Sequence, residues 1–143
     1  MKKRIVALLT AAMLLCGAMT CYAVSPQASH YFDGYMLVIS PQGNCEMAVS
    51  FSVFGTGKME QIGAYSIRIE EEFGQDKWYT ELTAYGDSDP DTFYRYDDYD
   101  CTGSFSFLGT PGVRYRAVMV GYAKNADGEE YSREVTCTAK VCK

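Results

Sequence analysis

Hydrophobic and polar residues alternate with a period of two along much of this chain, which is typical of β-strands that bury one face. In residues 45–54 the apolar face consists of Met47, Val49, Phe51 and Val53. A second alternation sets Tyr65, Ile67 and Ile69 against Ser66, Arg68 and Glu70. We expect these two segments to form the centre of the fold, with their apolar faces in the core.

Seven strands are predicted from such patterns. They cover residues 35–40, 45–54, 65–70, 78–85, 99–108, 113–122 and 130–141. Gly55 and Gly57 are expected to end the second strand, and Pro90 to force a loop over residues 87–91. Asp127-Gly128 is typical of a hairpin turn before the last strand. The predicted fold class is therefore all-β, an antiparallel β-sandwich of about seven strands in one domain.

The first 23 residues have the three parts of a secretory signal peptide. Basic residues occupy positions 2–4, an apolar run extends from Ile5 to about Met19, and small residues follow up to Ala23. The run is shorter than the roughly 18 to 20 unbroken apolar residues of a membrane anchor. We therefore expect a secreted product with no membrane span, either free outside the cell or associated with its surface.

Cleavage after Ala23 fits the preference of signal peptidase for small residues, and a cut after Ala18 is the alternative. Lipidation of Cys16 or Cys21 is less favoured, because neither follows a small residue such as Gly or Ala. The predicted organisation is a signal peptide over residues 1–23, a flexible N-terminal segment over 24–33 and a β-sandwich domain over 34–143.

The mature chain is expected to be strongly acidic. Removal of the signal peptide takes three of the 13 basic residues and none of the 18 acidic ones, which changes the formal net charge from −5 to −8. Such a chain repels nucleic acid and anionic membranes. Nucleic acid is therefore excluded as a partner, and the sequence gives no indication of oligomeric state.

Four cysteines remain after cleavage: Cys45, Cys101, Cys137 and Cys142. An even number of cysteines in an oxidising compartment predicts two disulfides, and their spacing leaves all three pairings open. Zinc is the competing interpretation. It is disfavoured because the closest pair is separated by four residues and has no partnering histidine.

The segment Gly109-Thr110-Pro111-Gly112-Val113-Arg114-Tyr115 resembles the part of fibronectin type III and immunoglobulin-like domains where a Pro-Gly turn leads into a strand with a corner tyrosine. The hairpin around Asp127-Gly128 is similar to the last hairpin of those domains, and the likeness covers residues 109–136. The only tryptophan, Trp78, is absent from the strand that carries one in immunoglobulin domains, so the fibronectin-like variant fits better. The whole chain also resembles small secreted bacterial proteins that consist of a leader and one cysteine-containing sandwich.

The resemblance implies two further features. The hydroxyl of Tyr115 would bond to the backbone upstream of its own strand. The start of the second strand and the end of the last would meet at one pole, which implies a Cys45–Cys142 disulfide and leaves Cys101 to pair with Cys137.

Catalytic chemistry finds little support in the sequence. Nucleophilic catalysis usually needs a histidine beside an activated serine or cysteine, and the only histidine, His30, lies in the N-terminal segment. Residues 55–58 (Gly-Thr-Gly-Lys) lack the glycine spacing and the following Ser or Thr of a phosphate-binding loop. We expect no enzymatic activity.

An acidic run supplies carboxylates at every second position, through Asp87, Asp89 and Asp91, as calcium loops do. The run lacks the glycine of an EF-hand loop and has Pro90 in its middle. Calcium is therefore the one metal that we consider as a ligand, and a solvated acidic loop is the favoured alternative.

Aromatic residues cluster between positions 78 and 99. The predicted ligand-binding residues are Trp78, Tyr79, Tyr94, Tyr96 and Tyr99. Exposed tyrosine among acidic residues suits contact with a protein or a glycan, because the ring gives area at low entropic cost. The predicted function is a secreted, non-enzymatic module that binds a protein or glycan at the cell exterior. The alternatives are an exported structural or protective protein without a specific ligand, and a calcium-stabilised adhesion module.

Overall fold

The structure is a computed structural model that describes residues 29–143. The predicted signal peptide and residues 24–28 of the predicted flexible segment lie outside the described residues. Within the described part, Phe32 begins the first strand and is buried in the core. The backbone carbonyls of His30 and Tyr31 accept hydrogen bonds from Thr56. The strand therefore starts two residues before the domain start expected at residue 34.

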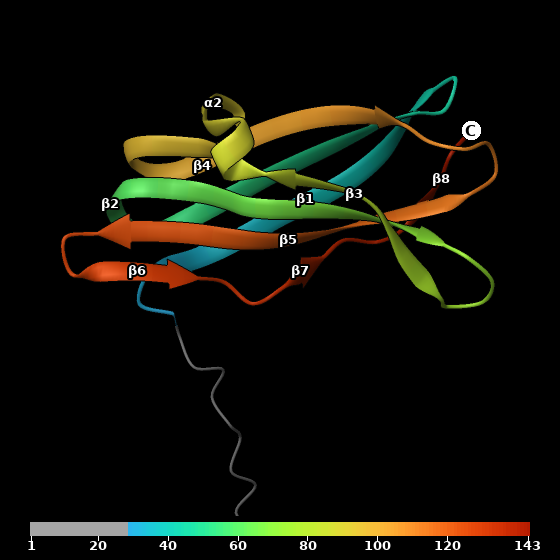
Figure 1. Ribbon diagram of the computed structural model, residues 1–143. Coiled ribbons are helices and arrows are strands. Elements are labelled where there is room, and N and C mark those ends of the chain that lie inside the picture. The colour runs from blue at the N-terminus through green and yellow to red at the C-terminus, as the bar shows by residue number, and fades with distance from the viewer. Residues whose placement is uncertain (1–28) are drawn as a thin grey trace, which may run out of the picture.

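The chain is all-β and antiparallel throughout (Figure 1). The strands are β1 (Phe32–Gly43), β2 (Glu46–Glu72), β3 (Trp78–Tyr85), β4 (Tyr94–Leu108), β5 (Arg114–Asn125), β6 (Gly128–Tyr131), β7 (Val135–Thr136) and β8 (Lys140–Val141). A 3₁₀ turn, η1 (Gly86–Ser88), and one helical turn, α2 (Pro90–Phe93), separate β3 from β4. The loop predicted over residues 87–91 is therefore mostly helical, because Pro90 is suited to the first turn of a helix.

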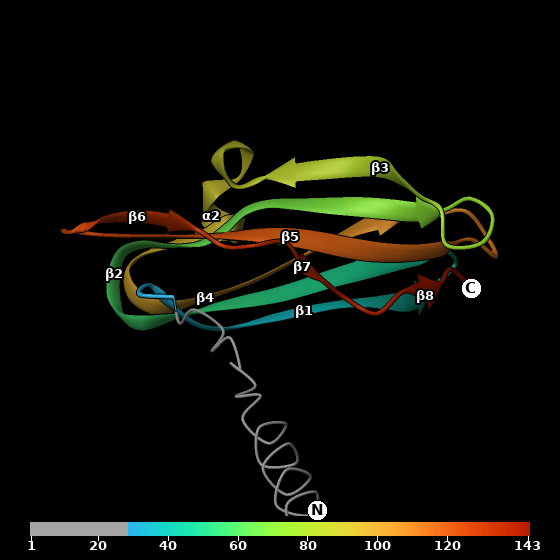
Figure 2. The ribbon, with the colours of Figure 1, turned by 90° about the horizontal axis from the view of Figure 1, so that it is seen from below.

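Strand β2 is the organising element of the fold. It runs for 27 residues and continues through Gly55 and Gly57, where the sequence predicted an end. At Gly55, a Cβ atom would lie 2.9 Å from the carbonyl oxygen of Gly57, so only glycine allows this close approach of backbone. Gly55 thus allows the strand to bend instead of ending it, and β2 passes from one layer of the molecule to the other (Figure 2).

The curled sheet has two halves that face each other (Figure 2). The first half of β2 lies between β1 and the second part of β4. The second half of β2 pairs with β5 on one side and with β3 and the start of β4 on the other. The short strands β6, β7 and β8 all pair with β5. The segment 130–141, predicted as one strand, is therefore divided into three pieces along the same neighbour.

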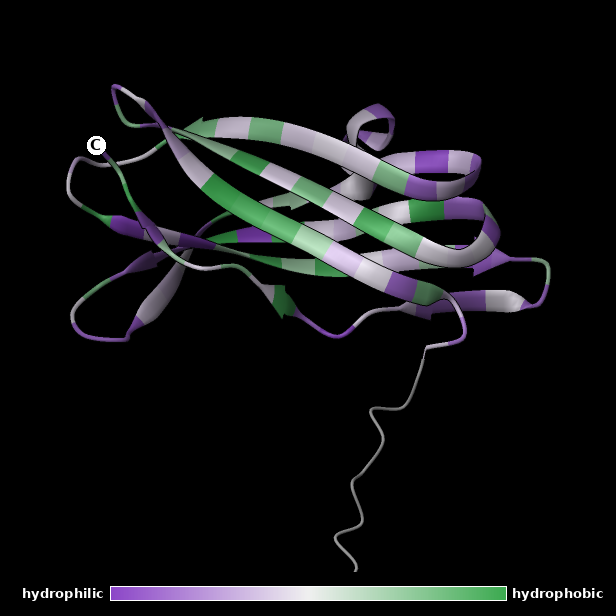
Figure 3. Ribbon diagram, turned by 180° about the vertical axis from the view of Figure 1, so that it is seen from behind, coloured by the Kyte–Doolittle hydropathy of each residue, from purple (hydrophilic) through white to green (hydrophobic). Residues whose placement is uncertain are grey.

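The core lies between the two halves of the sheet. The predicted apolar face of the first half of β2 is confirmed, since Met47, Val49, Phe51 and Val53 are all fully buried. Ile67 and Ile69 face them from the second half of β2. Figure 3 shows the alternation as green and pale bands along the strands. Burial of this apolar face is the main contribution to the stability of the fold.

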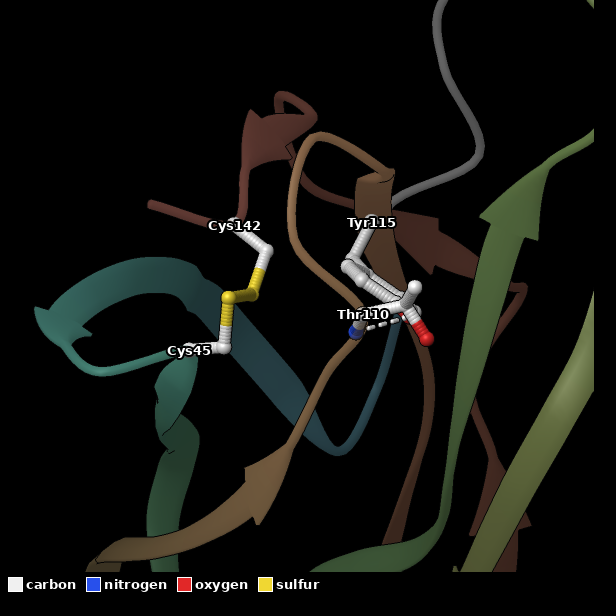
Figure 4. The surroundings of a disulfide bond; sticks show 4 residues. All are labelled: Cys45, Thr110, Tyr115 and Cys142. Carbon is white, nitrogen blue, oxygen red and sulfur yellow. Dashed lines mark hydrogen bonds between the residues drawn. A yellow bond between two sulfur atoms is a disulfide. The ribbon is translucent and has the colours of Figure 1, made fainter.

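One end of the molecule is closed by the Cys45–Cys142 disulfide, whose Cα atoms are 5.1 Å apart (Figure 4). This pairing agrees with the one implied by the resemblance. Beside it, the hydroxyl of Tyr115 accepts a hydrogen bond of 2.9 Å from the backbone N–H of Thr110. The predicted bond from Tyr115 to the upstream backbone is therefore present.

The second predicted disulfide is wrong, because Cys101 and Cys137 are free thiols. Cys101 lies on β4 opposite Val53 of β2, and its thiol donates to the carbonyl of Phe93. The sulfur of Cys137 lies next to the backbone of Ala117 and Ile39. The two sulfurs therefore have different neighbours, Cys101 the backbone of α2 and Cys137 the backbone of β1 and β5.

Loss of the disulfide is expected to destabilise the domain strongly. The bond joins residues 97 positions apart, and closure of a loop of this size contributes about 4 to 5 kcal/mol in the chain-entropy model. Urea unfolding of Cys45→Ala should give a free energy of unfolding lower by an amount of this order. Cys137→Ala, which breaks no cross-link, is the control. A Cys45→Ala protein that melts within a few degrees of wild type would refute this assignment.

Candidate binding surface

The five predicted ligand-binding residues do not form one surface. Trp78 lies opposite Glu72 at one end of the second half of β2, whereas Tyr94 lies opposite Gly63 near the bend. Nine residues of β2 separate these points, or about 30 Å of extended chain. Tyr96 and Tyr99 lie on the part of β4 that passes the bend. The aromatic-rich segment of the sequence is therefore spread along the molecule.

Trp78 and Tyr79 contact side chains of their own chain. The guanidinium of Arg116 lies 4.2 Å from the centre of the Trp78 ring, and that of Arg114 lies 5.8 Å from it. The Tyr79 ring packs edge-on against Phe73, with 6.0 Å between ring centres. Trp78 is thus partly covered by cationic neighbours from its own chain.

Tyr94, one of the predicted ligand-binding residues, is buried. Its ring packs against the backbone of Gly86, and its hydroxyl donates a hydrogen bond of 3.3 Å to Asp87. Tyr96 and Tyr99 are well exposed on β4. Tyr96 follows Tyr94 by two residues in unbroken register and so lies on the same strand face.

A different set of rings gathers near the bend, on the outer face formed by β2, β3, β4, β5 and β6. We call it the tyrosine cluster, and it consists of Tyr65, Tyr85, Tyr94, Tyr122 and Tyr131. The ring centres follow one another at 6.4 Å from Tyr85 to Tyr65, 5.1 Å to Tyr131, 5.1 Å to Tyr122 and 5.9 Å to Tyr94. Tyr85 and Tyr131 are exposed, Tyr65 is half-buried, and Tyr122 and Tyr94 are buried, so the cluster is rooted in the protein.

Tyr65 reaches the cluster because of a β-bulge. Ala64 pairs with Gly121 and Ser66 pairs with Val120, which leaves Tyr65 as an extra residue. A bulge turns the side chain of the extra residue away from the regular alternation. Tyr65 therefore lies against Tyr85 and Tyr131 on the outer face, and its prediction on the same face as Ile67 is wrong.

Tyr122 and Tyr131 are joined by hairpin register. Asn125 pairs with Gly128 across a two-residue turn, and three residues further along each strand Tyr122 pairs with Tyr131. The side chain of Asn125 accepts a hydrogen bond from the backbone N–H of Asp127, which stabilises the turn. The sequence signal for this pair is the predicted Asp127-Gly128 turn, although the two central residues of the turn are Ala126 and Asp127, one position earlier.

Two carboxylates border the cluster. The Tyr122 hydroxyl donates a hydrogen bond of 2.6 Å to Glu129, and the Tyr94 hydroxyl donates to Asp87. Burial raises the pKa of Tyr94 and of Tyr122 well above the ordinary value, and the adjacent carboxylates raise both further. Burial, with Glu129 and Asp87, also raises the pKa of Tyr131. The rings are therefore neutral and lie in a negative field.

The opposite end of the same outer face holds paired charges. Glu70 is buried and accepts hydrogen bonds from Arg68 at 2.8 Å and Arg116 at 2.7 Å. Burial alone would raise the pKa of Glu70, but the bonds from the two guanidinium groups lower it on balance. Arg68 also pairs with Glu134, and Arg114 with Glu72. The cationic side chains of this face are thus neutralised near Trp78.

Calcium gains no geometric support from the acidic run. Asp87 lies in η1, Asp91 lies in α2, and Asp89 is the residue that precedes α2. Among residues 29–143, no group of three His, Cys, Asp or Glu side chains is arranged to hold a metal ion. Asp87 is directed to the Tyr94 hydroxyl.

Groups with catalytic potential are dispersed. Burial raises the pKa of the Cys101 thiol to about 11, so this cysteine is protonated and unreactive near neutral pH. Burial also raises the pKa of Cys137. His30 is exposed at the start of the described chain. Within that described part, no helix is long and apolar enough to cross a membrane.

Comparison with known proteins gives no relative. No protein-family model matches the chain, and no curated protein or solved structure matches it. The fold and the candidate surface are therefore interpreted from the chain's own geometry.

Gly86→Ala is expected to disrupt the base of the tyrosine cluster. A Cβ atom at residue 86 would lie 2.5 Å from the carbonyl oxygen of Ala64 and 2.6 Å from the hydroxyl oxygen of Tyr94. Displacement of this buried ring should cost about 1 to 3 kcal/mol, measured by thermal melting. Gly57→Ala, where a Cβ would contact nothing within 4 Å, is the matched control. Equal melting temperatures for the two variants would contradict this packing.

Alkaline pH is expected to unfold the protein as its buried phenols ionise. Burial raises the pKa of Tyr35 from 10.0 to about 12. Because this pKa is higher in the folded chain, the neutral phenol stabilises the fold fully below pH 10, and this stabilisation is lost as the pH rises to about 12. In a pH titration, part of the tyrosinate absorbance should therefore rise only well above pH 10, together with loss of structure. Complete ionisation of all tyrosines near pH 10 in a folded protein would contradict this expectation.

Proposed function

We propose that this chain is a secreted, non-enzymatic β-sandwich module of the fibronectin-like kind that binds a protein or glycan through its tyrosine cluster. The single observation that carries the proposal is the chain of four contacts among five tyrosine rings, 5.1 to 6.4 Å between centres, which includes the exposed Tyr85 and Tyr131. Exposed aromatic rings on a rigid sheet are typical of binding surfaces.

Three further features support a binding role. The exposed rings stand on strands and on buried rings, so little side-chain entropy is lost when a ligand binds. The predicted leader and the Cys45–Cys142 disulfide fit a protein that works outside the cell. The bond from Tyr115 to the backbone of Thr110 favours the fibronectin-like arrangement of the sandwich.

The absence of catalysis belongs to the same proposal. In residues 29–143, the protonated Cys101 is buried in the core and His30 lies exposed at the edge of β1. The carboxylates beside the cluster, Asp87 and Glu129, each accept a hydrogen bond from a tyrosine. These carboxylates border neutral phenols and no nucleophile, which is the arrangement of a contact surface.

Substitution at the cluster is expected to abolish ligand capture. Wild type and the double variant Tyr85→Ala/Tyr131→Ala would be tested on glycan arrays and on a panel of purified extracellular proteins. Removal of two exposed rings should weaken binding about tenfold or more. Tyr79→Ala is the matched control, since Tyr79 is 55% exposed against 50% and 49% for Tyr85 and Tyr131, and lies at the other end of β3.

The alternatives give different results in the same assay. A structural or protective protein would capture nothing, and a calcium-stabilised module would bind or melt differently only when millimolar calcium is added. Binding that is lost equally in Tyr79→Ala would move the contact surface to the Trp78 end of β3. Each of these results would overturn the proposal.

A further inference from the structure

We infer that the ligand of the tyrosine cluster is cationic, namely a lysine or arginine side chain presented by a basic peptide segment of a partner protein. This inference rests on the proposed function and specifies the chemistry of its ligand. It depends on three observations: the charges around the cluster, the orientation of its rings and the location of the chain's own cations.

The carboxylates at the cluster lack cationic partners. All four ion pairs of residues 29–143 involve Arg68, Arg114 or Arg116, at the Trp78 end of the outer face. Asp87 and Glu129 take part in none of them. Each accepts only a neutral tyrosine hydroxyl within the described residues and forms no ion pair there.

The orientation of the rings favours a cation over a sugar. The rings of Tyr85 and Tyr131 meet Tyr65 at interplanar angles of 77° and 88°. Such edge-to-face contacts cover the face of only one ring in each pair, and they form angled walls instead of the flat platform on which a sugar stacks. A cation is attracted to the negative face of an aromatic ring, and angled rings are the arrangement that surrounds it.

Lys124 and Arg95 lie beside members of the cluster, but their charges are not paired with its carboxylates. Lys124 lies opposite Glu129 in the hairpin register and is exposed, but it forms no ion pair within the described chain. Arg95 is used by its own strand, because its guanidinium donates to the carbonyls of Asp91 and Tyr94. Trp78, by contrast, is already covered by Arg116. The chain thus satisfies one aromatic site with its own cations and leaves the other to an external one.

The experiment is a titration of the folded protein with a lysine octapeptide, followed by NMR of the tyrosine rings. A glutamate octapeptide and a neutral oligosaccharide such as cellopentaose are the comparison probes. We expect the lysine peptide alone to shift the ring signals of Tyr65, Tyr85 and Tyr131, and to bind more weakly as salt is added. Tyr85→Leu, which keeps apolar volume but loses the ring, should weaken binding about two- to fivefold.

Two variants distinguish attraction of the peptide by a carboxylate at the cluster from attraction by the net charge of the protein. Glu129→Gln keeps an acceptor for the Tyr122 hydroxyl but removes the charge, and should weaken binding of the lysine peptide about threefold or more. Asp76→Asn removes one charge from the β2–β3 turn, where the backbone φ of 55° suits asparagine, and should leave binding unchanged. Equal weakening by both variants would reduce the effect to net charge and overturn the inference.

The two proposals fail in different ways. Ring shifts caused by cellopentaose and not by the lysine peptide would overturn the cationic ligand and retain a binding module. No shift with any probe, together with no capture in the array and protein panel, would overturn both.

Discussion

The bend of β2 at Gly55 is the constraint on which the rest of the structure depends. A single strand pairs with β1 and β4 before the bend and with β3, β4 and β5 after it, so the two halves of the sheet share one backbone. The core is then formed by two stretches of the same strand that face each other. Hydrogen-bonded ladders and apolar burial on both sides of the bend are therefore coupled, and unfolding of one half would expose the apolar face of the other.

Much of the fold could be predicted from the sequence, because alternation of apolar residues reports burial directly. The face from Met47 to Val53 and the strand Trp78–Tyr85 follow from it. The order of apolar and polar residues gave wrong predictions where backbone geometry decides the structure. Gly55 breaks the apolar pattern whether a strand ends or bends, and the pattern does not report the bend, in which the backbone of Gly55 closely approaches Gly57 of the same strand. Cys101 and Cys137 are likewise unpaired because of their neighbours in the fold, which the spacing of the cysteines in the sequence does not report.

The kind of surface, but not the residues that form it, could be predicted from the sequence. An acidic, tyrosine-rich surface was expected, but the expected residues lie up to about 30 Å apart because β3 and β4 run along different parts of β2. The bulge at Tyr65 and the register of Tyr122 with Tyr131 gather rings from distant parts of the chain. The same outer face separates its charges: guanidinium groups surround Glu70 and Trp78, whereas carboxylates and exposed rings remain near the bend. This separation gives one face of a small domain two electrostatic characters.

Amide hydrogen exchange along β2, measured by NMR on the folded protein, tests most directly whether this shared strand makes the molecule one cooperative unit. The account predicts that buried amides before the bend, in residues 47–53, and after it, in residues 62–69, exchange with the same free energy, equal to that of global unfolding. Exchange of one stretch at a clearly lower free energy than the other would contradict it, because the two halves of the sheet would then open independently.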